Sequence, residues 1–356
     1  MRFIYTLGSL FFFLFLFSCS SQSETTAGIG LPDTLRIQSL DTFPIPSSIR
    51  ALEVLNDSTA WFAGSGGVYG YTEDGGRHWT VDSLLADSVR PHFRSIAVTE
   101  EAVFLLSIAS PALLYRSEDK GESWQAVYRE DHPAVFYDAL AFWDDKAGIA
   151  MGDPIDGCLS VLLTRDGGRS WRKLPCSQLP PAEEGEAAFA ASNSNIALYG
   201  HHAWMVSGGK RARVFHTPDR GASWEVFSTP FIEGEQMTGI FSVDFYDEKQ
   251  GVIFGGDWNR KEMNSRNKAV TKDGGHTWRL VSEGKGPGYR SCVQYIPQSQ
   301  GKGIMACGIP GISCSVDGGE NWSALSTENF YTLRFGESWQ TLWLAGDGKI
   351  GKMTLE

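Results

Sequence analysis

Six copies of one eight-residue pattern constrain the fold of this chain more than any other feature of its sequence. Each copy reads Ser or Thr, any residue, Asp, any residue, Gly, two further residues and Trp, and the copies begin at Thr72, Ser117, Thr164, Thr217, Thr271 and Ser315. Successive aspartates of the pattern are 45, 47, 53, 54 and 44 residues apart. A period of about 40 to 50 residues is the length of one four-stranded propeller blade. The sequence therefore predicts an all-β ring of repeated units.

The aspartates of the pattern are interpreted as structural residues. They are Asp74, Asp119, Asp166, Asp219, Asp273 and Asp317. An Asp side chain that accepts backbone N–H groups closes a turn, Gly supplies a positive φ, and Trp opens the next strand with its ring over the hairpin. Six separate copies argue against a role as metal ligands or catalytic acids.

Short runs rich in β-branched and aromatic residues surround each copy, as strands require. In the first unit these runs cover 50–55, 59–63, 68–72 and 79–82. A last unit without the pattern has three runs, 330–335, 341–345 and 349–353, and the stretch 34–39 would supply its fourth strand. Such pairing of the chain ends removes free sheet edges. We predict a seven-bladed β-propeller over residues 33–356, with the N-terminal strand closing the last blade.

The first residues predict export and lipid anchoring. Residues 1–18 begin with one arginine, continue through an apolar run and end in Leu-Phe-Ser before Cys19, which is typical of a signal segment too short to span a membrane comfortably. The small residue before Cys19 resembles a lipobox; the alternative is a plain secretory signal. Residues 19–32 are small and polar, as in a flexible tether. We expect a bacterial cell-envelope protein at the outer membrane, with the lipid as its one membrane contact.

Charge and cysteine usage exclude several classes of function. With 31 Lys and Arg against 42 Asp and Glu, the net charge is −11, which disfavours a nucleic-acid partner. The five cysteines after Cys19 have no CxxC spacing and are odd in number, so no zinc site or full disulfide framework is predicted; they are Cys158, Cys176, Cys292, Cys307 and Cys314. Their disulfide state stays open. No nucleotide, flavin, haem or metal motif is present, so we expect no cofactor, and we expect a monomer.

A charged cluster is predicted at one mouth of the central channel. Aligning the units on their first strand places seven residues at equivalent positions near this mouth: Arg50, Arg94, Asp138, Ala190, Phe241, Arg290 and Tyr331. Loops after the second strands add Asp153, Lys210 and Asp257, and Glu186 lies ahead of the fourth inner strand. Guanidinium groups pair bidentately with carboxylates, so the mouth is predicted to bind an acidic group of a protein or glycan. Alternatively, the arginines pair with these acids and plug the channel.

The repeated pattern resembles the Asp box of the sialidase-like, BNR-repeat propellers. Further motifs resemble an exported bacterial propeller family related to the photosystem II stability and assembly factors: Gly152-Asp-Pro-Ile-Asp-Gly157, Gly185-Glu-Ala-Ala-Phe189, Val206-Ser-Gly-Gly-Lys210, Gly255-Gly-Asp257, Tyr289-Arg-Ser-Cys-Val293 and Gly346-Asp-Gly-Lys-Ile-Gly-Lys352. The resemblance covers essentially the whole chain after the signal. It implies a propeller that binds a partner protein, as an assembly factor does, without catalysis.

The alternative function is an envelope glycoside hydrolase of the sialidase-like kind. Asp138 and Glu186 would be its paired carboxylates, because glycoside hydrolysis needs two. Against this, residues 43–46 lack the arginine of the sialidase motif, and Tyr331 with Glu328 is only a loose match to the Tyr and Glu pair. Sialidase propellers also have six blades. An open pocket with two nearby carboxylates would favour the enzyme.

We predict that Cys19 carries a lipid, because the lipobox-like residues and the polar tether occur together. Cells that express the protein should incorporate radiolabelled palmitate into it, and the Cys19→Ser variant should not be labelled. Label that persists in the variant would contradict the prediction.

Overall fold

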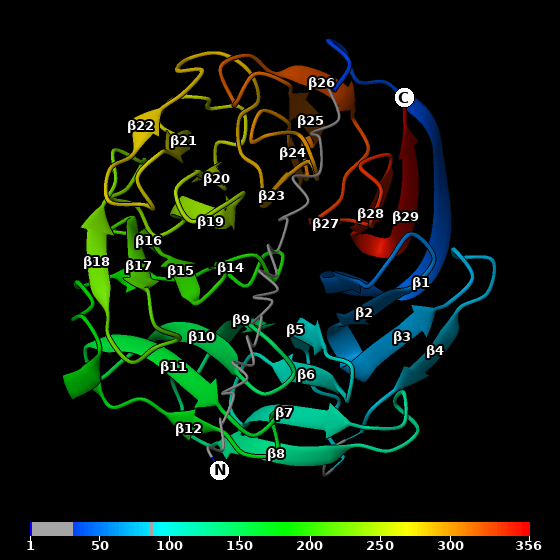
Figure 1. Ribbon diagram of the computed structural model, residues 1–356, viewed down its shortest axis with the longest axis vertical. Coiled ribbons are helices and arrows are strands. Elements are labelled where there is room, and N and C mark those ends of the chain that lie inside the picture. The colour runs from blue at the N-terminus through cyan, green and yellow to red at the C-terminus, as the bar shows by residue number, and fades with distance from the viewer. Residues whose placement is uncertain (2–30, 86–87) are drawn as a thin grey trace.

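The computed structural model describes Met1 and residues 31–85 and 88–356 (Figure 1). The predicted signal segment, Cys19 and nearly all of the tether lie outside these residues. The described chain is all-β, with two single-turn 3-10 helices, η1 (Ser65–Gly67) and η2 (Cys176–Gln178), and no α-helix. No helix in the described ranges is long and apolar enough to cross a membrane.

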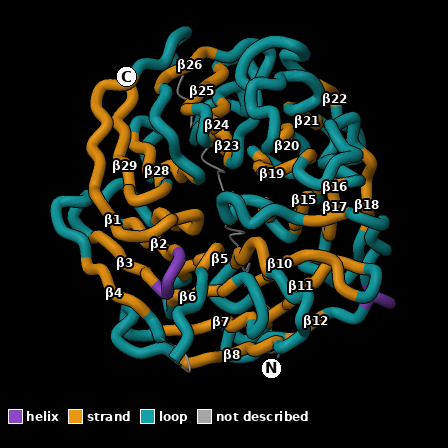
Figure 2. Tube along the Cα trace, turned by 180° about the vertical axis from the view of Figure 1, so that it is seen from behind, coloured by secondary structure: helices purple, strands orange, loops and turns teal. Residues whose placement is uncertain are grey.

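Antiparallel sheets stand radially around a central axis, which is the arrangement of a β-propeller (Figures 1 and 2). Four sheets have four strands each: β5 (Phe93–Val98), β6 (Val103–Ser107), β7 (Ala112–Ser117) and β8 (Gln125–Glu130); β9 (Tyr137–Phe142), β10 (Gly148–Ile155), β11 (Cys158–Thr164) and β12 (Arg172–Lys173); β14 (Ile196–Tyr199), β15 (His202–Val206), β17 (Arg213–Thr217) and β18 (Glu225–Ser228); β23 (Cys292–Tyr295), β24 (Ile304–Gly308), β25 (Gly311–Ser315) and β26 (Ser323–Ser326).

Two larger sheets complete the described ring. One joins β19 (Thr238–Phe245), β20 (Gly251–Asp257), β21 (Lys268–Thr271) and β22 (Arg279–Leu280) to a small ribbon of β13 (Glu186–Ala187) and β16 (Gly208–Gly209). The other contains, in spatial order, β27 (Thr332–Phe335), β28 (Thr341–Ala345), β29 (Asp347–Leu355), β1 (Ile37–Val54), β2 (Ala60–Gly64), β3 (Val68–Thr72) and β4 (Thr80–Ser83).

Strand β1 joins the two ends of the chain. Its first part pairs antiparallel with β29, from Ile37 opposite Leu355 to Pro44 opposite Lys349, and its last part pairs with β2. Arg36 and Glu356 exchange two backbone hydrogen bonds of 2.9 Å. In Figure 1 the blue β1 therefore lies beside the red β29. The predicted pairing of an N-terminal strand with the last strands is confirmed, although the strand begins at Ile37 and continues without a break into the first unit.

The Asp boxes are closed turns, as their sequence predicts. At Asp166, Thr164 Oγ1 donates to Oδ1 (2.8 Å), Ser170 N donates to the same oxygen (3.0 Å), and Ser170 Oγ donates to Oδ2 (2.6 Å). Gly168 N donates to Thr164 Oγ1 (3.0 Å) at a φ of 71°. In the equivalent turn of the second unit, the hydroxyl and backbone N–H of Ser123 lower the pKa of Asp119 to about 2. The carboxylates are occupied by their own turns.

The box tryptophans connect neighbouring sheets, a role that sequence reasoning did not assign. Trp171, only 9% exposed, meets Phe104 of the preceding sheet edge to face, with ring centroids 6.5 Å apart, and Phe142 of its own sheet at 5.7 Å. Trp124 packs on Tyr69 in the same way, at 5.1 Å. Each indole ring fills the wedge-shaped space between two sheets. The Asp box therefore stabilises the propeller as well as its own hairpin.

We predict that Trp171→Ala lowers the free energy of unfolding by about 3 to 5 kcal/mol, because it leaves a cavity between two sheets. Chemical denaturation measures the change. Tyr199→Ala is the control, since Tyr199 is 42% exposed and should cost far less. Equal stabilities of the Trp171 variant and the parent would show that the ring does not pack as described.

Candidate functional site

A segment without regular structure, residues 188–195, occupies the centre of the ring. Its polar groups bond to the inner strands of several sheets: Asn193 Nδ2 donates to Ile96 O (2.8 Å) and Asn193 Oδ1 accepts from Leu140 N (3.0 Å). Ser194 Oγ lies 2.7 Å from Ser242 Oγ. In Figure 1 the chain next to β14 accordingly lies near the middle of the ring. The alignment that placed Ala190 on a fourth inner strand is wrong, because that strand is β14 and Ala190 belongs to this central segment.

Arg334 fastens the central segment to β27. Its Nη2 donates to Asn193 O (2.8 Å) and Ser192 O (3.3 Å), while Nη1 donates to Leu333 O (2.7 Å). Thr332 Oγ1 adds a bond to Ser192 O (2.9 Å). Backbone carbonyls that leave water need such partners. The central segment therefore occupies the middle of the channel. The predicted ion-paired plug is not formed in the described chain, where Glu186 pairs with Arg213 and Asp257 with Arg260.

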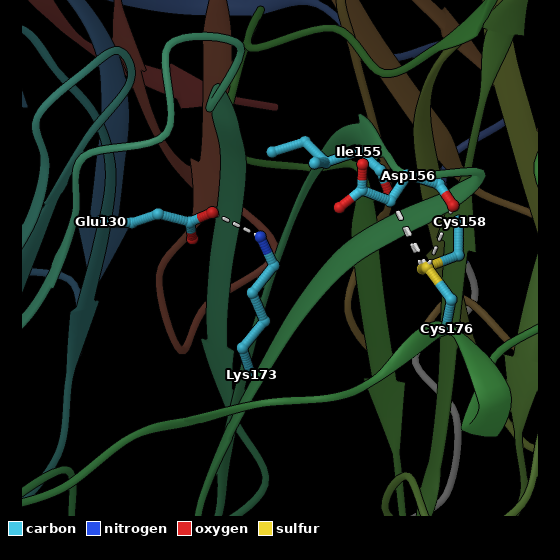
Figure 3. Close-up of a disulfide and its surroundings, with 6 residues drawn as sticks. All are labelled: Glu130, Ile155, Asp156, Cys158, Lys173 and Cys176. Carbon is cyan, nitrogen blue, oxygen red and sulfur yellow. Dashed lines mark hydrogen bonds and ion pairs between the residues drawn. A yellow bond between two sulfur atoms is a disulfide. The ribbon is translucent and has the colours of Figure 1, made fainter.

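The chain between β12 and the central segment is fixed by a disulfide and an ion pair. Cys158, at the start of β11, is bonded to Cys176 in η2 (Figure 3). Further along, the buried Glu186 accepts from Arg213 Nε (3.0 Å), and also from Ser207 Oγ (2.5 Å) and Glu183 N (2.9 Å). Glu186 is thus a structural anchor that does not lie at the predicted mouth. The disulfide resolves the pairing that the sequence left open; Cys292, Cys307 and Cys314 are free and buried.

The mouth pocket is a cavity of about 320 Å³ where the inner strands begin. Arg50, Arg94 and Asp153 line it, as predicted. The central segment orients both arginines: Arg50 Nη1 donates to Ala191 O (3.4 Å) and Arg94 Nη1 donates to Ala190 O (3.1 Å). The Arg50 guanidinium lies 3.8 Å from the centre of the Tyr331 ring, so Tyr331 contacts the pocket arginine without lining the pocket itself.

Burial shifts the pKa values of the charged groups at the mouth. Burial, with Arg50 nearby, lowers the pKa of Arg94 to about 10, which leaves it protonated. Asp138 is fully buried beside Arg94 and has no hydrogen-bond donor among the described residues. Burial and the neighbouring Asp153 raise its pKa well above the ordinary value, and burial also raises the pKa of Asp153. Both shifts reflect the cost of burying a carboxylate charge.

Aromatic rings form the other wall of the mouth pocket. Phe189 stacks on Phe241 with centroids 3.9 Å apart, and Tyr289 meets Phe241 (4.8 Å) and Trp258 (5.4 Å) edge to face. Phe189 and Trp258 are partly exposed. Alignment of the inner strands placed Phe241 at the mouth, as observed, but sequence reasoning missed the rest of this wall. Its signal was the two long spacings of 53 and 54 residues, since the units with extra length carry Phe189 and Trp258 on added loops.

Three other predicted site residues have local partners and do not line the pocket. Arg290 donates to Ser313 Oγ (2.8 Å) and to Tyr289 O (2.8 Å). The buried Asp257 accepts from Arg260 Nε (2.6 Å). Lys210 is exposed, with Nζ 3.7 Å from Glu184. These residues therefore do not line the mouth pocket with Arg50 and Arg94.

The residues of the glycosidase alternative are not arranged as a catalytic pair. Neither Asp138 nor Glu186 lines the mouth pocket, and Glu186 is occupied by Arg213. Glu328 forms an ion pair with Lys349 (2.5 Å), so its carboxylate is engaged and is not a free partner for Tyr331. An open site with two free carboxylates, which that mechanism needs, is not formed by the predicted residues.

A second cavity of about 300 Å³ lies at the opposite ends of the inner strands. Glu53, Asp244, Gln294 and Arg334 line it together with the central segment. Burial raises the pKa of Glu53 and of Asp244 to about 7. Sequence reasoning did not assign these residues, which face the channel three or four positions after the residues aligned at the mouth.

Among the described residues, no group of three or more His, Cys, Asp or Glu side chains is arranged to hold a metal ion. His202 Nδ1 lies 2.9 Å from His216 Nε2, and the Trp204 ring stacks beside both. This pair is packed within β15 and β17.

Comparison with known proteins gives distant similarities. No family model matches the chain. Over 133 residues, 37% of the chain, it is 29% identical to the chloroplast photosystem II stability/assembly factor HCF136 of Arabidopsis thaliana, and the match spans 29% of that protein. The chain is thus distantly similar to a photosystem II assembly factor across about a third of its length.

Solved structures share the propeller fold across nearly the whole chain. A structure described as YCF48 bound to D1 peptide matches with a TM-score of 0.63 and 16% identity, over 90% of this chain and 99% of that one. Virginiamycin B lyase of Staphylococcus aureus matches at 0.64 and 12%, over 89% and 99%. The xyloglucanase of Xanthomonas campestris matches at 0.62 and 14%, over 90% and 53%. Neighbours of such different activity establish the fold alone.

We predict that loss of the Cys158–Cys176 disulfide lowers the free energy of unfolding by about 3 kcal/mol, since it closes a loop with a sequence separation of 18 residues. Denaturation of the Cys158→Ser/Cys176→Ser variant measures this. Reductant should destabilise the parent protein and leave the double variant unchanged. A parent protein insensitive to reductant would contradict the prediction.

Proposed function

We propose that the protein is a non-catalytic propeller that binds a segment of a partner protein at the mouth pocket, as an assembly factor does. The observation that carries the proposal is the pair of arginines, Arg50 and Arg94, held at the edge of a 320 Å³ cavity by carbonyl groups of the central segment. Both arginines line this pocket together with Asp153, and burial raises the pKa of Asp153 and of the neighbouring Asp138. Such a site favours an anionic group.

The comparisons favour a protein partner over a glycan. One similar protein is a photosystem stability and assembly factor, and one similar structure is described as bound to a peptide. The aromatic wall is also suited to a polypeptide, because aromatic residues and arginine dominate protein recognition sites. A photosystem component is not implied for this chain.

We further propose the setting in which this binding occurs. Counting β1 in both of the units that it joins gives seven four-stranded blades. Cys19 carries a lipid that anchors a monomer in the bacterial envelope, at the outer membrane, and the polar residues 19–32 separate the propeller from the lipid. The sequence features of residues 1–32 support this arrangement.

The proposal predicts that Arg94→Ala weakens partner binding by about 1.5 to 3 kcal/mol, the range for hydrogen bonds to a charged group. The tagged protein captures partners from envelope extract, and the affinity of the purified partner is then measured for the parent and the variant. Lys210→Ala is the matched control, because Lys210 is an exposed cation outside the pocket.

Melting temperatures are measured alongside, and Arg50→Lys tests the guanidinium fork while the charge is kept. Full partner affinity in both arginine variants would contradict the assignment of the mouth pocket as the binding site. Binding on a glycan array, with no protein partner captured, would contradict the protein-binding function.

A further inference from the structure

Charged and apolar side chains both line the mouth pocket, and this combination restricts what it can bind. Arg50 and Arg94 supply the positive charge. Phe136, Phe189, Met237 and Trp258 contribute partly exposed apolar surface to the other walls. A cavity of about 320 Å³ is at the lower end of the size of small-ligand sites. It has room for a short piece of a ligand and not for a folded surface.

The two arginines can pair with an anion in the pocket. Each donates from Nη1 to a carbonyl of the central segment, and each guanidinium group carries further N–H donors. A guanidinium group is best matched by a planar anion with two oxygens. Asp153 also lines the pocket. A carboxylate meets this requirement with its two coplanar oxygens.

The apolar residues that line the pocket favour a ligand with a large apolar side chain. Phe189 covers Phe241 with one face of its ring, and Trp258 is braced edge to face by Tyr289, with Lys261 Nζ 4.4 Å from the centre of the indole ring. These contacts fix the rings before a ligand arrives, which lowers the entropic cost of binding. Met237 adds an adaptable surface beside them. An aromatic or long aliphatic side chain would bury this exposed area.

We infer that the mouth pocket recognises a carboxylate adjacent to a large apolar side chain within a partner polypeptide. This inference rests on the proposed function and specifies the group that is bound. The carboxylate pairs with Arg50 and Arg94, and the apolar side chain lies against Phe189 and Trp258. The same chemistry is offered by a chain terminus that ends in Phe or Leu and by an internal Asp or Glu next to such a residue.

Short fluorescent peptides test the inference directly. The parent peptide is fluorescein-Gly-Ser-Gly-Ser-Gly-Phe with a free carboxylate. It is compared with its C-terminal amide, with the same peptide ending in Ala, and with an amidated peptide ending in Asp-Phe. Fluorescence anisotropy should show the amide and the Ala peptide binding at least about tenfold more weakly than the parent, a difference of about 1.4 kcal/mol.

The amidated Asp-Phe peptide distinguishes the two sources of the carboxylate. Recovery of binding assigns the site to acidic side chains, and continued weak binding assigns it to chain termini; both results support the inference. Equal binding of the acid and the amide, or of the Phe and Ala peptides, overturns it. So does a parent peptide that does not bind at about 1 mM.

Two substitutions test which residues recognise the apolar side chain and which recognise the carboxylate. Trp258→Ala should remove most of the preference for Phe over Ala, and Arg94→Gln should remove the preference for the acid over the amide. Tyr199→Ala, an exposed aromatic substitution outside the pocket, should change neither. If partner binding depends on Arg94 while Trp258→Ala changes nothing, the inference fails and the proposed function stands. If binding is unaffected by Arg94 as well, both fail.

Discussion

Backbone hydrogen bonding at the centre of the ring is the constraint on which the site depends. Residues 188–195 cross the channel without forming a strand, so their carbonyl and N–H groups need partners from the surrounding strands. Arg334 and Thr332 satisfy the carbonyls on one side, and Arg50 and Arg94 contact those on the other. The two mouth arginines are therefore structural partners of this segment and are oriented toward the pocket by the same bonds.

Stability and binding come from different parts of the molecule: the repeated Asp boxes and the segments that are not repeated. The Asp boxes repeat one turn and insert one tryptophan between neighbouring sheets, so they supply ring stability from local sequence. The binding surface comes from the parts that break the repeat, which are the central segment and the loop that carries Trp258. The Cys158–Cys176 disulfide restrains the chain that leads into the central segment.

The strands and boxes could be predicted because their determinants are local. The predicted runs 68–72 and 341–345 coincide with β3 and β28, and the boxes adopt the turn that their residues require. The site was only half predictable. Strand alignment places Arg50 and Arg94 together, since equivalent positions on inner strands meet at one mouth. It assigned Arg290 to the same mouth, because alignment does not reveal that Ser313 holds its guanidinium group.

Other parts of the site depend on contacts that have no sequence signature. Asp257 is held by Arg260, three residues further on, and Glu186 by Arg213, in a different strand. The disulfide joins cysteines 18 residues apart without a recognisable motif. The path of the central segment follows from the space left inside the ring, so it becomes visible only when all the inner strands are in place.

The shared strand β1 has a consequence for the growing chain. It is the first strand of the described chain to be synthesised, and its partner β29 is the last. Residues 37–44 therefore cannot pair with β29 until all the other strands have been synthesised. A waiting strand edge can pair with other chains. Pro44 and Pro46 lack the N–H groups that such pairing uses, and Asp41 places a charge on the same stretch. The strand that completes the ring thus carries residues that oppose its premature pairing.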